Sequence, residues 1–168
     1  MSDLGLRQVV QNLHTTLERD TLVQVTLHQL RLSLKVERVV LYYFYRPWEG
    51  QVTFESLEHA QYSIFGSKGP DECFNGEYAA MYEAGRVRAI ADIETEPISQ
   101  CHRDFLKTIQ VRANLVAPVL NHQGLWGLLI AHACVSPRSW LPSDLEIMVE
   151  SSQKLATSPA INRSRSFF

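Results

Sequence analysis

Apolar residues recur at intervals of three and four in two segments near the start of the chain, and this spacing predicts amphipathic helices. The first segment has its apolar face on Leu6, Val9, Val10, Leu13 and Leu17. The second segment repeats the spacing at Val23, Leu27, Leu30 and Leu34. Asp20 directly precedes the second segment, and aspartate is a preferred residue for capping the first turn of a helix. We therefore expect two helices within residues 4–34.

Five later segments are rich in β-branched and aromatic residues, a composition that predicts strands. They read "RVVLYYFY" (38–45), "QVTFESL" (51–57), "VRAIADI" (87–93), "ANLVAPVL" (113–120) and "LWGLLIAHACV" (125–135). The tetrapeptide "NHQG" separates the last two segments and predicts a β-hairpin. In the last strand, alternation predicts that one face carries Trp126, Leu128, Ile130, His132 and Cys134.

Three further helices are predicted between and after these strands. A short helix covers residues 75–84 and ends at Gly85, and another carries the sequence "CHRDFL". Ser143 and Glu146 predict a capping box at the start of a last helix. A proline limits that helix, and we expect the final segment "NRSRSFF" to fray.

The order of these elements predicts an α+β fold in a single domain that spans residues 1–168. Hairpins at both ends of the strand set predict a central antiparallel sheet of five or six strands. The strand over 125–134 is apolar on both faces, so helices are expected on both faces of the sheet. Within the domain we expect N-terminal helices over 4–34, a core over 36–158 and a C-terminal tail over 159–168.

The composition argues against several classes of protein. The chain has 168 residues, of which 45% are hydrophobic, and a formal net charge of -2 with scattered basic residues. Such a charge favours neither nucleic acid nor a membrane surface as a partner. The sequence has no signal-peptide pattern and no membrane-spanning apolar run, so a cytoplasmic location is expected. Three cysteines without a C-x-x-C spacing predict neither a structural disulfide nor a zinc site.

The segment "ISQCHRDFL" (98–106) carries the candidate chemistry. Helical spacing places Ile98, Cys101, His102, Phe105 and Ile109 on one apolar stripe. A thiol and an imidazole are therefore expected side by side on a face that should be buried. Taken alone, these residues fit ordinary core positions, a cysteine nucleophile with a histidine base, or a thiol that anchors a ligand.

Three segments together resemble a known family. They are "DECF" (71–74), "GRVRAIADI" (85–93) and "CHRDFL…VRANLVAPVL…LWGLLIAH" (101–132). These segments are similar to the GAF photosensory domains of cyanobacteriochromes, relatives of phytochromes that carry a linear tetrapyrrole, or bilin. The Asp-x-Cys-Phe tetrapeptide resembles the subgroup with two chromophore-linking cysteines. The resemblance implies a bilin-binding photoreceptor with the GAF fold, and not an enzyme.

The resemblance also implies roles for individual residues. Cys101 would hold ring A of the bilin through a permanent thioether, and His102 would lie along the pyrrole rings. Cys73 would add reversibly to the central methine bridge, and Asp71 would face the pyrrole N–H groups. His132 would lie near ring D, the ring that rotates when light isomerises the chromophore.

The remaining candidates concern the rim of the chromophore site. Phe74 and Tyr78 are candidate chromophore contacts, although their helical spacing also fits ordinary core positions. Relatives often have a basic residue for a propionate where this chain has Met81, and Arg86 or Arg88 could replace it. The resemblance implies phycocyanobilin or phycoviolobilin as the chromophore, with a blue-absorbing dark state and a green-absorbing photoproduct.

Two other functions stay open at this point. A cysteine enzyme similar to GAF-type methionine sulfoxide reductases would oxidise Cys73 and Cys101 to a disulfide during turnover. A GAF module could also bind a cyclic nucleotide without any covalent bond. The terminal helices are candidates for a homodimer contact, and the sequence identifies no output domain.

Overall fold

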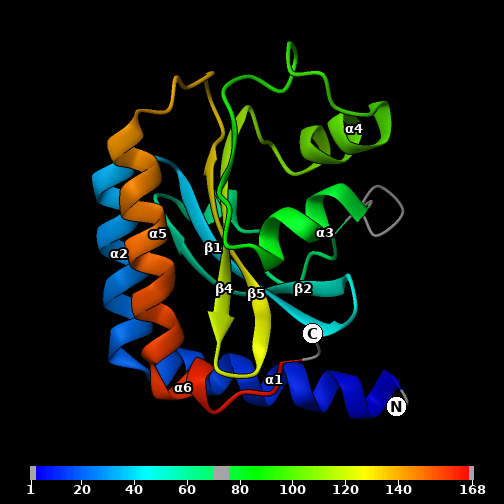
Figure 1. The fold of residues 1–168 in the computed structure, drawn as a ribbon, viewed down its shortest axis with the longest axis vertical. Helices are drawn as coiled ribbons and strands as arrows, with labels where there is room; N and C mark the ends of the chain where they lie inside the picture. Colours follow the sequence, from blue (N-terminus) through cyan, green and yellow to red (C-terminus); the bar gives the residue numbers. More distant parts are fainter. Residues whose placement is uncertain (1–2, 70–75, 167–168) are drawn as a thin grey trace.

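A five-stranded sheet lies between two groups of helices in a computed structural model of the chain (Figure 1). The structure describes residues 3–69 and 76–166, and the side chains of residues 4–69 and 80–166. The helices are α1 (Asp3–Arg19), α2 (Thr21–Leu34), α3 (Gly76–Glu83), α4 (Gln100–Thr108), α5 (Pro142–Thr157) and α6 (Pro159–Asn162). The strands are β1 (Arg38–Arg46), β2 (Glu49–Leu57), β3 (Arg88–Ile90), β4 (Ala113–Asn121) and β5 (Gly124–Ala133). Antiparallel pairing in the order β2-β1-β5-β4-β3 confirms the predicted α+β fold, with five strands.

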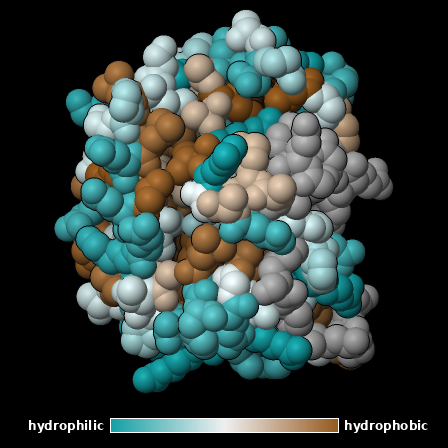
Figure 2. Space-filling view, viewed as in Figure 1, coloured by the Kyte–Doolittle hydropathy of each residue, from teal (hydrophilic) through white to brown (hydrophobic). Residues whose placement is uncertain are grey.

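The two faces of the sheet have separate apolar cores. Helices α1, α2, α5 and α6 cover one face, and α3 and α4 lie on the other (Figure 1). The larger core lies beneath the first group, and its completely buried side chains include Leu17, Leu27, Leu34, Leu129 and Met148. On the outside, hydrophobic residues gather in the middle of the view, between α5 and α3, whereas α1 is mostly hydrophilic (Figure 2). The second face is the one that holds a cavity.

The last hairpin differs from the prediction in one respect. Its register shifts between Val119, which pairs with Gly127, and Leu120, which pairs with Leu125. Trp126 is therefore an extra residue on β5, a bulge that turns its side chain to the opposite face. There Trp126 is completely buried, 5.2 Å from the ring centre of Tyr43. The predicted common face is thus wrong for Trp126, while Leu128 remains on the cavity side.

Helix capping follows the prediction at one helix and departs from it at another. Asp20 caps α2 as predicted, because its Oδ1 accepts hydrogen bonds from the backbone N–H groups of Leu22 and Val23. The predicted capping box at Ser143 is wrong, because α5 begins at Pro142. Proline suits the first position of a helix, where its missing N–H is not needed. Asp144 takes the capping role and accepts from the N–H of Leu141 at 2.9 Å.

The C-terminal segment packs against the body of the domain. The Tyr43 hydroxyl donates to the backbone oxygen of Arg165 at 2.8 Å. The Ser166 hydroxyl donates to the backbone oxygen of Leu125 at 2.7 Å. The predicted fraying is therefore wrong as far as Ser166. Within residues 3–69 and 76–166, no helix has the length and apolar character needed to cross a membrane.

Candidate functional site

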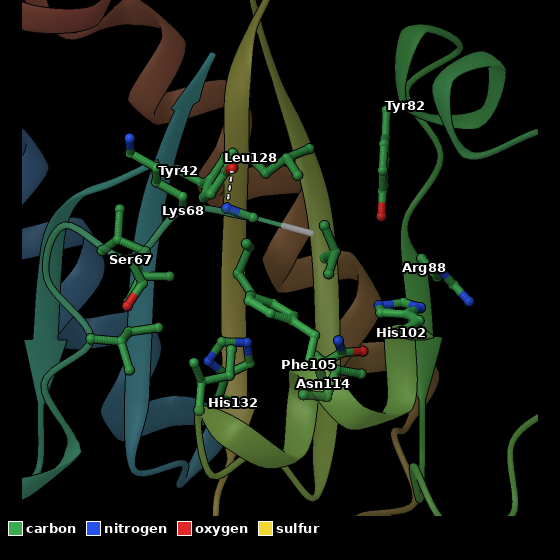
Figure 3. Close-up of a pocket in the computed structure, with 18 residues that line it drawn as sticks. Tyr42, Ser67, Lys68, Tyr82, Arg88, His102, Phe105, Asn114, Leu128 and His132 are labelled. Atoms are coloured by element: carbon green, nitrogen blue, oxygen red, sulfur yellow. Dashed lines mark hydrogen bonds between the residues drawn. The ribbon is translucent and has the colours of Figure 1, made fainter. Parts of the chain in front are cut away.

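A cavity lies between the sheet and α4, with one wall formed by the segment that follows β2 (Figure 3). Strands β1, β4 and β5 supply its floor, α4 supplies His102 and Phe105, and α3 supplies Tyr82. Most of the exposed lining is apolar, and the polar groups are few. The apolar lining consists mainly of Val40, Val52, Ile64, Phe105, Leu106, Ile109, Val116, Leu128 and Ile130. An apolar slot with few fixed polar groups is the usual form of a small-molecule site.

The structure brings together two of the residues that the sequence singled out. His102 and His132 both line the cavity, from α4 and from β5 respectively (Figure 3). Cys101 lies beside His102 in the first turn of α4, and its side chain is exposed rather than buried as predicted. Arg86 is also exposed, whereas Arg88 is half-buried and lines the cavity.

The other predicted site residues lie before α3 in the sequence or within its first turn. Asp71, Cys73 and Phe74 lie outside the described residues, and so does the side chain of Tyr78. The segment before them is fixed against the sheet, because the backbone N–H of Gly69 donates to the hydroxyl of Tyr42 at 2.6 Å.

His102 is a neutral ring at pH 7. Its burial, and then the nearby charge of Arg88, lower the pKa of His102 to about 4. The side chain is still partly open to the cavity. His102 can therefore offer a neutral donor or acceptor to a bound molecule but carries no charge near neutrality.

His132 is buried and bonded to an arginine from the neighbouring strand. Arg38 is completely buried, and its Nε donates to Nδ1 of His132 at 2.9 Å. Burial, and then the charge of Arg38, lower the pKa of His132 well below its usual value. The remaining nitrogens of Arg38 donate to the backbone oxygens of Tyr62 and Ile109. The arginine thus connects the sheet to the end of α4 and to the segment after β2.

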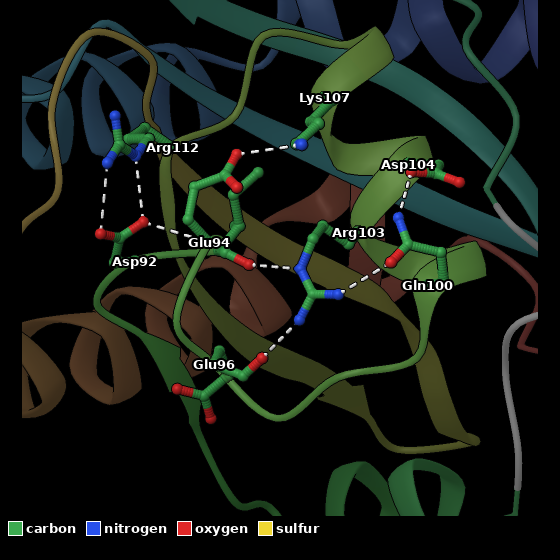
Figure 4. Close-up of polar contacts among 9 residues, drawn as sticks. Asp92, Glu94, Glu96, Gln100, Arg103, Asp104, Lys107 and Arg112 are labelled. Carbon is green, nitrogen blue, oxygen red and sulfur yellow. Dashed lines mark hydrogen bonds and ion pairs between the residues drawn. The ribbon is translucent and has the colours of Figure 1, made fainter.

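The N-terminal end of α4, which carries Cys101, is fixed by hydrogen bonds to the preceding loop (Figure 4). Ser99 caps the helix and accepts from the N–H of His102 at 3.1 Å. Arg103 donates to the backbone oxygens of Ile93 and Glu96, each at 2.8 Å. A capped and anchored first turn holds Cys101 and His102 in a fixed orientation relative to the sheet.

The cysteines differ in their chemical state. Cys101 is disulfide-bonded in the structure, whereas Cys134 is a free thiol. The expectation that the cysteines form no structural disulfide is therefore wrong for Cys101. Burial raises the pKa of Cys134 to about 11, so this thiol is a poor nucleophile. Cys101 becomes available to bind a ligand through sulfur only after reduction.

Several cavity residues were missed by the sequence reasoning. Tyr42 and Asn114 line the cavity, and Arg38 bonds to His132 of its lining, but the patterns of their strand segments predicted only core positions. A charged or amide residue inside an apolar strand is the signal that could have drawn attention to Arg38 and Asn114.

Comparisons with known proteins agree with this fold. The GAF domain family model matches residues 18–158. An uncharacterized protein of Picosynechococcus is 49% identical, over 93% of this chain and 96% of that protein. The circadian input-output histidine kinase CikA of Synechocystis is 31% identical, over 90% of this chain, but the chain spans only 23% of that kinase.

Two solved structures have the same architecture. The blue-light absorbing form of the PixJ GAF domain from Thermosynechococcus elongatus aligns with a TM-score of 0.76 and 27% identity, over 92% of this chain and 88% of that one. A phycocyanobilin-bound GAF domain from a cyanobacterial phytochrome aligns with a TM-score of 0.74 and 25% identity, over 94% of each chain. The family match over most of the length shows that this chain belongs to the GAF domain family.

Proposed function

We propose that this chain is a bilin-binding photoreceptor domain in which a linear tetrapyrrole occupies the cavity beside α4. The observation that carries the proposal is the apolar cavity with His102, His132 and Arg88 on its walls. The likeness to the PixJ and phycocyanobilin-bound GAF domains supports it. When bound, the tetrapyrrole would supply light absorption and isomerisation of the double bond between rings C and D.

The residues present fit such a molecule. The conjugated rings of a bilin are flat and apolar, and they suit a slot lined by Phe105, Val116 and Leu128. Its two propionates need cations, and Arg88 lies at the cavity with Arg86 exposed two residues away. We infer that Arg88 is the main propionate partner, and that Arg86 contributes from the surface.

Cys101 is the proposed permanent anchor. Its position in the first turn of α4 favours a negatively charged thiolate, which is the nucleophilic form of cysteine. Addition of the reduced thiol to a side-chain double bond of ring A would form one C–S bond and move the thiol proton to the adjacent carbon. This addition requires neither an oxidant nor a reductant. His102, neutral at pH 7, would hydrogen-bond to the ring system.

Cys73 and Asp71 are proposed as the switchable part of the site. By resemblance, Cys73 would form a second, reversible thioether at the central methine bridge, and Asp71 would face the pyrrole N–H groups. Phe74 and Tyr78 would contribute aromatic contacts. These roles rest on the resemblance of the sequence motif. The same resemblance makes phycocyanobilin or phycoviolobilin the expected chromophore.

Covalent attachment through Cys101 tests the proposal. The chain is produced together with enzymes that make phycocyanobilin and is then run on a denaturing gel with zinc, which makes attached bilin fluoresce. We expect fluorescence from the wild type and from Cys134→Ala, and none from Cys101→Ala. Cys134 is the matched control because it is a cysteine outside the cavity lining. A Cys101→Ala protein with full fluorescence would contradict the assignment.

Methionine sulfoxide reduction is a second candidate, favoured by the disulfide state of Cys101. In that reaction two thiols are oxidised to a disulfide, the sulfoxide is reduced to the thioether, and its oxygen leaves as water. The reduced protein is incubated with methionine sulfoxide and dithiothreitol. Methionine formation that disappears in Cys101→Ala would support the enzyme, and absence of turnover would leave the photoreceptor as the function.

The sequence also predicts a cytoplasmic location and a homodimer contact through the terminal helices. Leu4 and Val9 of α1 are exposed, at 79% and 37%, and a dimer could cover them. Light scattering of the wild type and of Leu4→Glu tests this contact. A lower mass for the variant supports the dimer, and a monomeric wild type contradicts it.

A further inference from the structure

Three neighbouring strands place three polar residues in one row on the cavity side of the sheet. His132 on β5 pairs in register with Arg38 on β1 and with Asn114 on β4. His132 and Asn114 both line the cavity (Figure 3). Directly opposed residues of antiparallel strands typically have Cβ atoms about 5 Å apart, so the two side chains can contact one bound group.

Arg38 determines what His132 can offer. A guanidinium has only donors, so the Nδ1 atom that receives the 2.9 Å hydrogen bond must carry a lone pair. A neutral imidazole with a lone pair on Nδ1 has its proton on Nε2. Among the described residues, Nε2 of His132 has no hydrogen-bond partner. His132 is therefore a donor to whatever occupies the cavity.

Asn114 offers the complementary group. Its side chain is 4% exposed, and its Oδ1 is buried without a hydrogen-bond partner among the described residues. An unpaired buried carbonyl is costly to the folded protein unless a ligand donor satisfies it. The unsatisfied oxygen is thus an acceptor on the residue that pairs in register with His132.

We propose that Arg38 is a positioning residue that fixes His132 as an Nε2–H donor, and that His132 and Asn114 together bind the adjacent C=O and N–H of a cyclic amide. The carbonyl oxygen of the cyclic amide accepts from His132, and its N–H donates to Asn114. The inference deepens the proposed function, because the terminal rings of a linear tetrapyrrole are cyclic amides. It assigns roles to Arg38 and Asn114 that neither the sequence motifs nor the comparisons provide.

The tautomer of His132 is the first test, and it needs no chromophore. Long-range ¹H–¹⁵N NMR of the apoprotein at pH 7 should show Nε2 of His132 protonated and Nδ1 unprotonated. Arg38→Met should give a mixture of tautomers, and Arg38→Lys, which keeps a donor, should retain the wild-type pattern. A wild-type protein with its proton on Nδ1 would overturn the proposal even if the variants fail to fold.

Binding of a small cyclic amide is the second test. The probe is 2-pyrrolidinone, and N-methyl-2-pyrrolidinone, which lacks the N–H, is the matched control. We expect 2-pyrrolidinone to shift the NMR signals of His132. N-methyl-2-pyrrolidinone should bind the wild type about tenfold more weakly than 2-pyrrolidinone does. 2-Pyrrolidinone should likewise bind Asn114→Leu about tenfold more weakly than it binds the wild type. Asn12→Leu, on the exposed face of α1, should leave binding unchanged.

The two tests separate this inference from the proposed function. Equal binding of the two probes, with normal uptake of phycocyanobilin, would overturn the paired site and leave the photoreceptor standing. Selective binding of 2-pyrrolidinone without any uptake of phycocyanobilin would support the paired site and contradict the photoreceptor.

Discussion

Asp92 and Arg112 are joined by two parallel hydrogen bonds, from Nε to Oδ1 at 3.0 Å and from Nη2 to Oδ2 at 3.2 Å (Figure 4). The pair connects the turn after β3 to the residue that precedes β4. The backbone N–H of Ile93 also donates to the backbone oxygen of Arg112 at 2.9 Å. Side chains and backbone thus fix the beginning of the loop that leads to Cys101.

We expect the replacement Arg112→Met to loosen this loop. A bidentate pair gives more geometric constraint than a single exposed contact, because two bonds fix the orientation of both groups. The control is Lys107→Met, which removes a single-contact ion pair of 3.1 Å with Glu94. Hydrogen exchange at the backbone N–H of Ile93 should accelerate in Arg112→Met and not in Lys107→Met. Bilin attachment should also be slower in Arg112→Met. Equal exchange in both variants would show that the Asp92 pair does not order the loop.

The stability of the apoprotein should depend on pH through His102. The pKa of His102 is lowered to about 4, whereas an unfolded histidine has its ordinary value of 6.5. Between these values the unfolded state binds the extra proton, so the free energy of unfolding falls as the pH is lowered from 6.5 to 4. One proton corresponds to a slope of at most about 1.4 kcal/mol per pH unit.

The replacement His102→Gln should remove this part of the slope. His132 also has a lowered pKa and contributes in the same direction, and Asp92, whose pKa is lowered from 3.8, contributes mainly below pH 4, so the comparison between variant and wild type isolates His102. Urea unfolding at pH 4, 5, 6 and 7 measures both proteins. Identical pH dependence would mean that His102 is more open to water than the structure indicates.

The neighbouring arginines provide a matched pair for the propionate proposal. Arg88 lines the cavity and Arg86 is exposed, although both carry the same charge two residues apart. Arg88→Ala should lower bilin occupancy several-fold, because a charged hydrogen bond at the cavity is lost. Arg86→Ala should have a smaller effect. Occupancy is measured as the ratio of bilin to protein absorbance, and the reverse order would transfer the main role to Arg86.

Cys73 decides whether the chain has a second chromophore bond. A thiolate that adds to the central methine makes that carbon sp³ and divides the conjugated path, which shifts absorption to the blue. Cys73→Ala should therefore keep the bilin attached through Cys101 but lose the blue-absorbing state, and the dark state should absorb at a longer wavelength. If the variant keeps the blue band, Cys73 does not bridge the chromophore.

Local patterns in the sequence predicted most of the fold. The cap at Asp20, the apolar stripes of α1 and α2 and the turn between β4 and β5 depend on residues close together in the chain. The side chain of Trp126 was misplaced because a bulge depends on the register between two strands, which alternation alone does not determine.

The cavity was predicted only in part, for a similar reason. His102 and His132 follow from motifs, but the bond between Arg38 and His132 joins residues 94 positions apart. The unpaired oxygen of Asn114 is visible only once the cavity walls are in place. Arg88 was separable from Arg86 only once the structure placed Arg86 in the turn after α3 and Arg88 at the start of β3, on the cavity wall.

Reversible photoconversion of the holoprotein tests the central claim most directly. The chain is purified with phycocyanobilin attached, and its absorption spectrum is recorded in the dark, after blue light and after green light. We expect two interconverting spectra, with a blue band that falls under blue light as a green band rises, and that recovers under green light. A covalently attached bilin whose spectrum does not change under any illumination would contradict the assignment of this GAF domain as a photoreceptor.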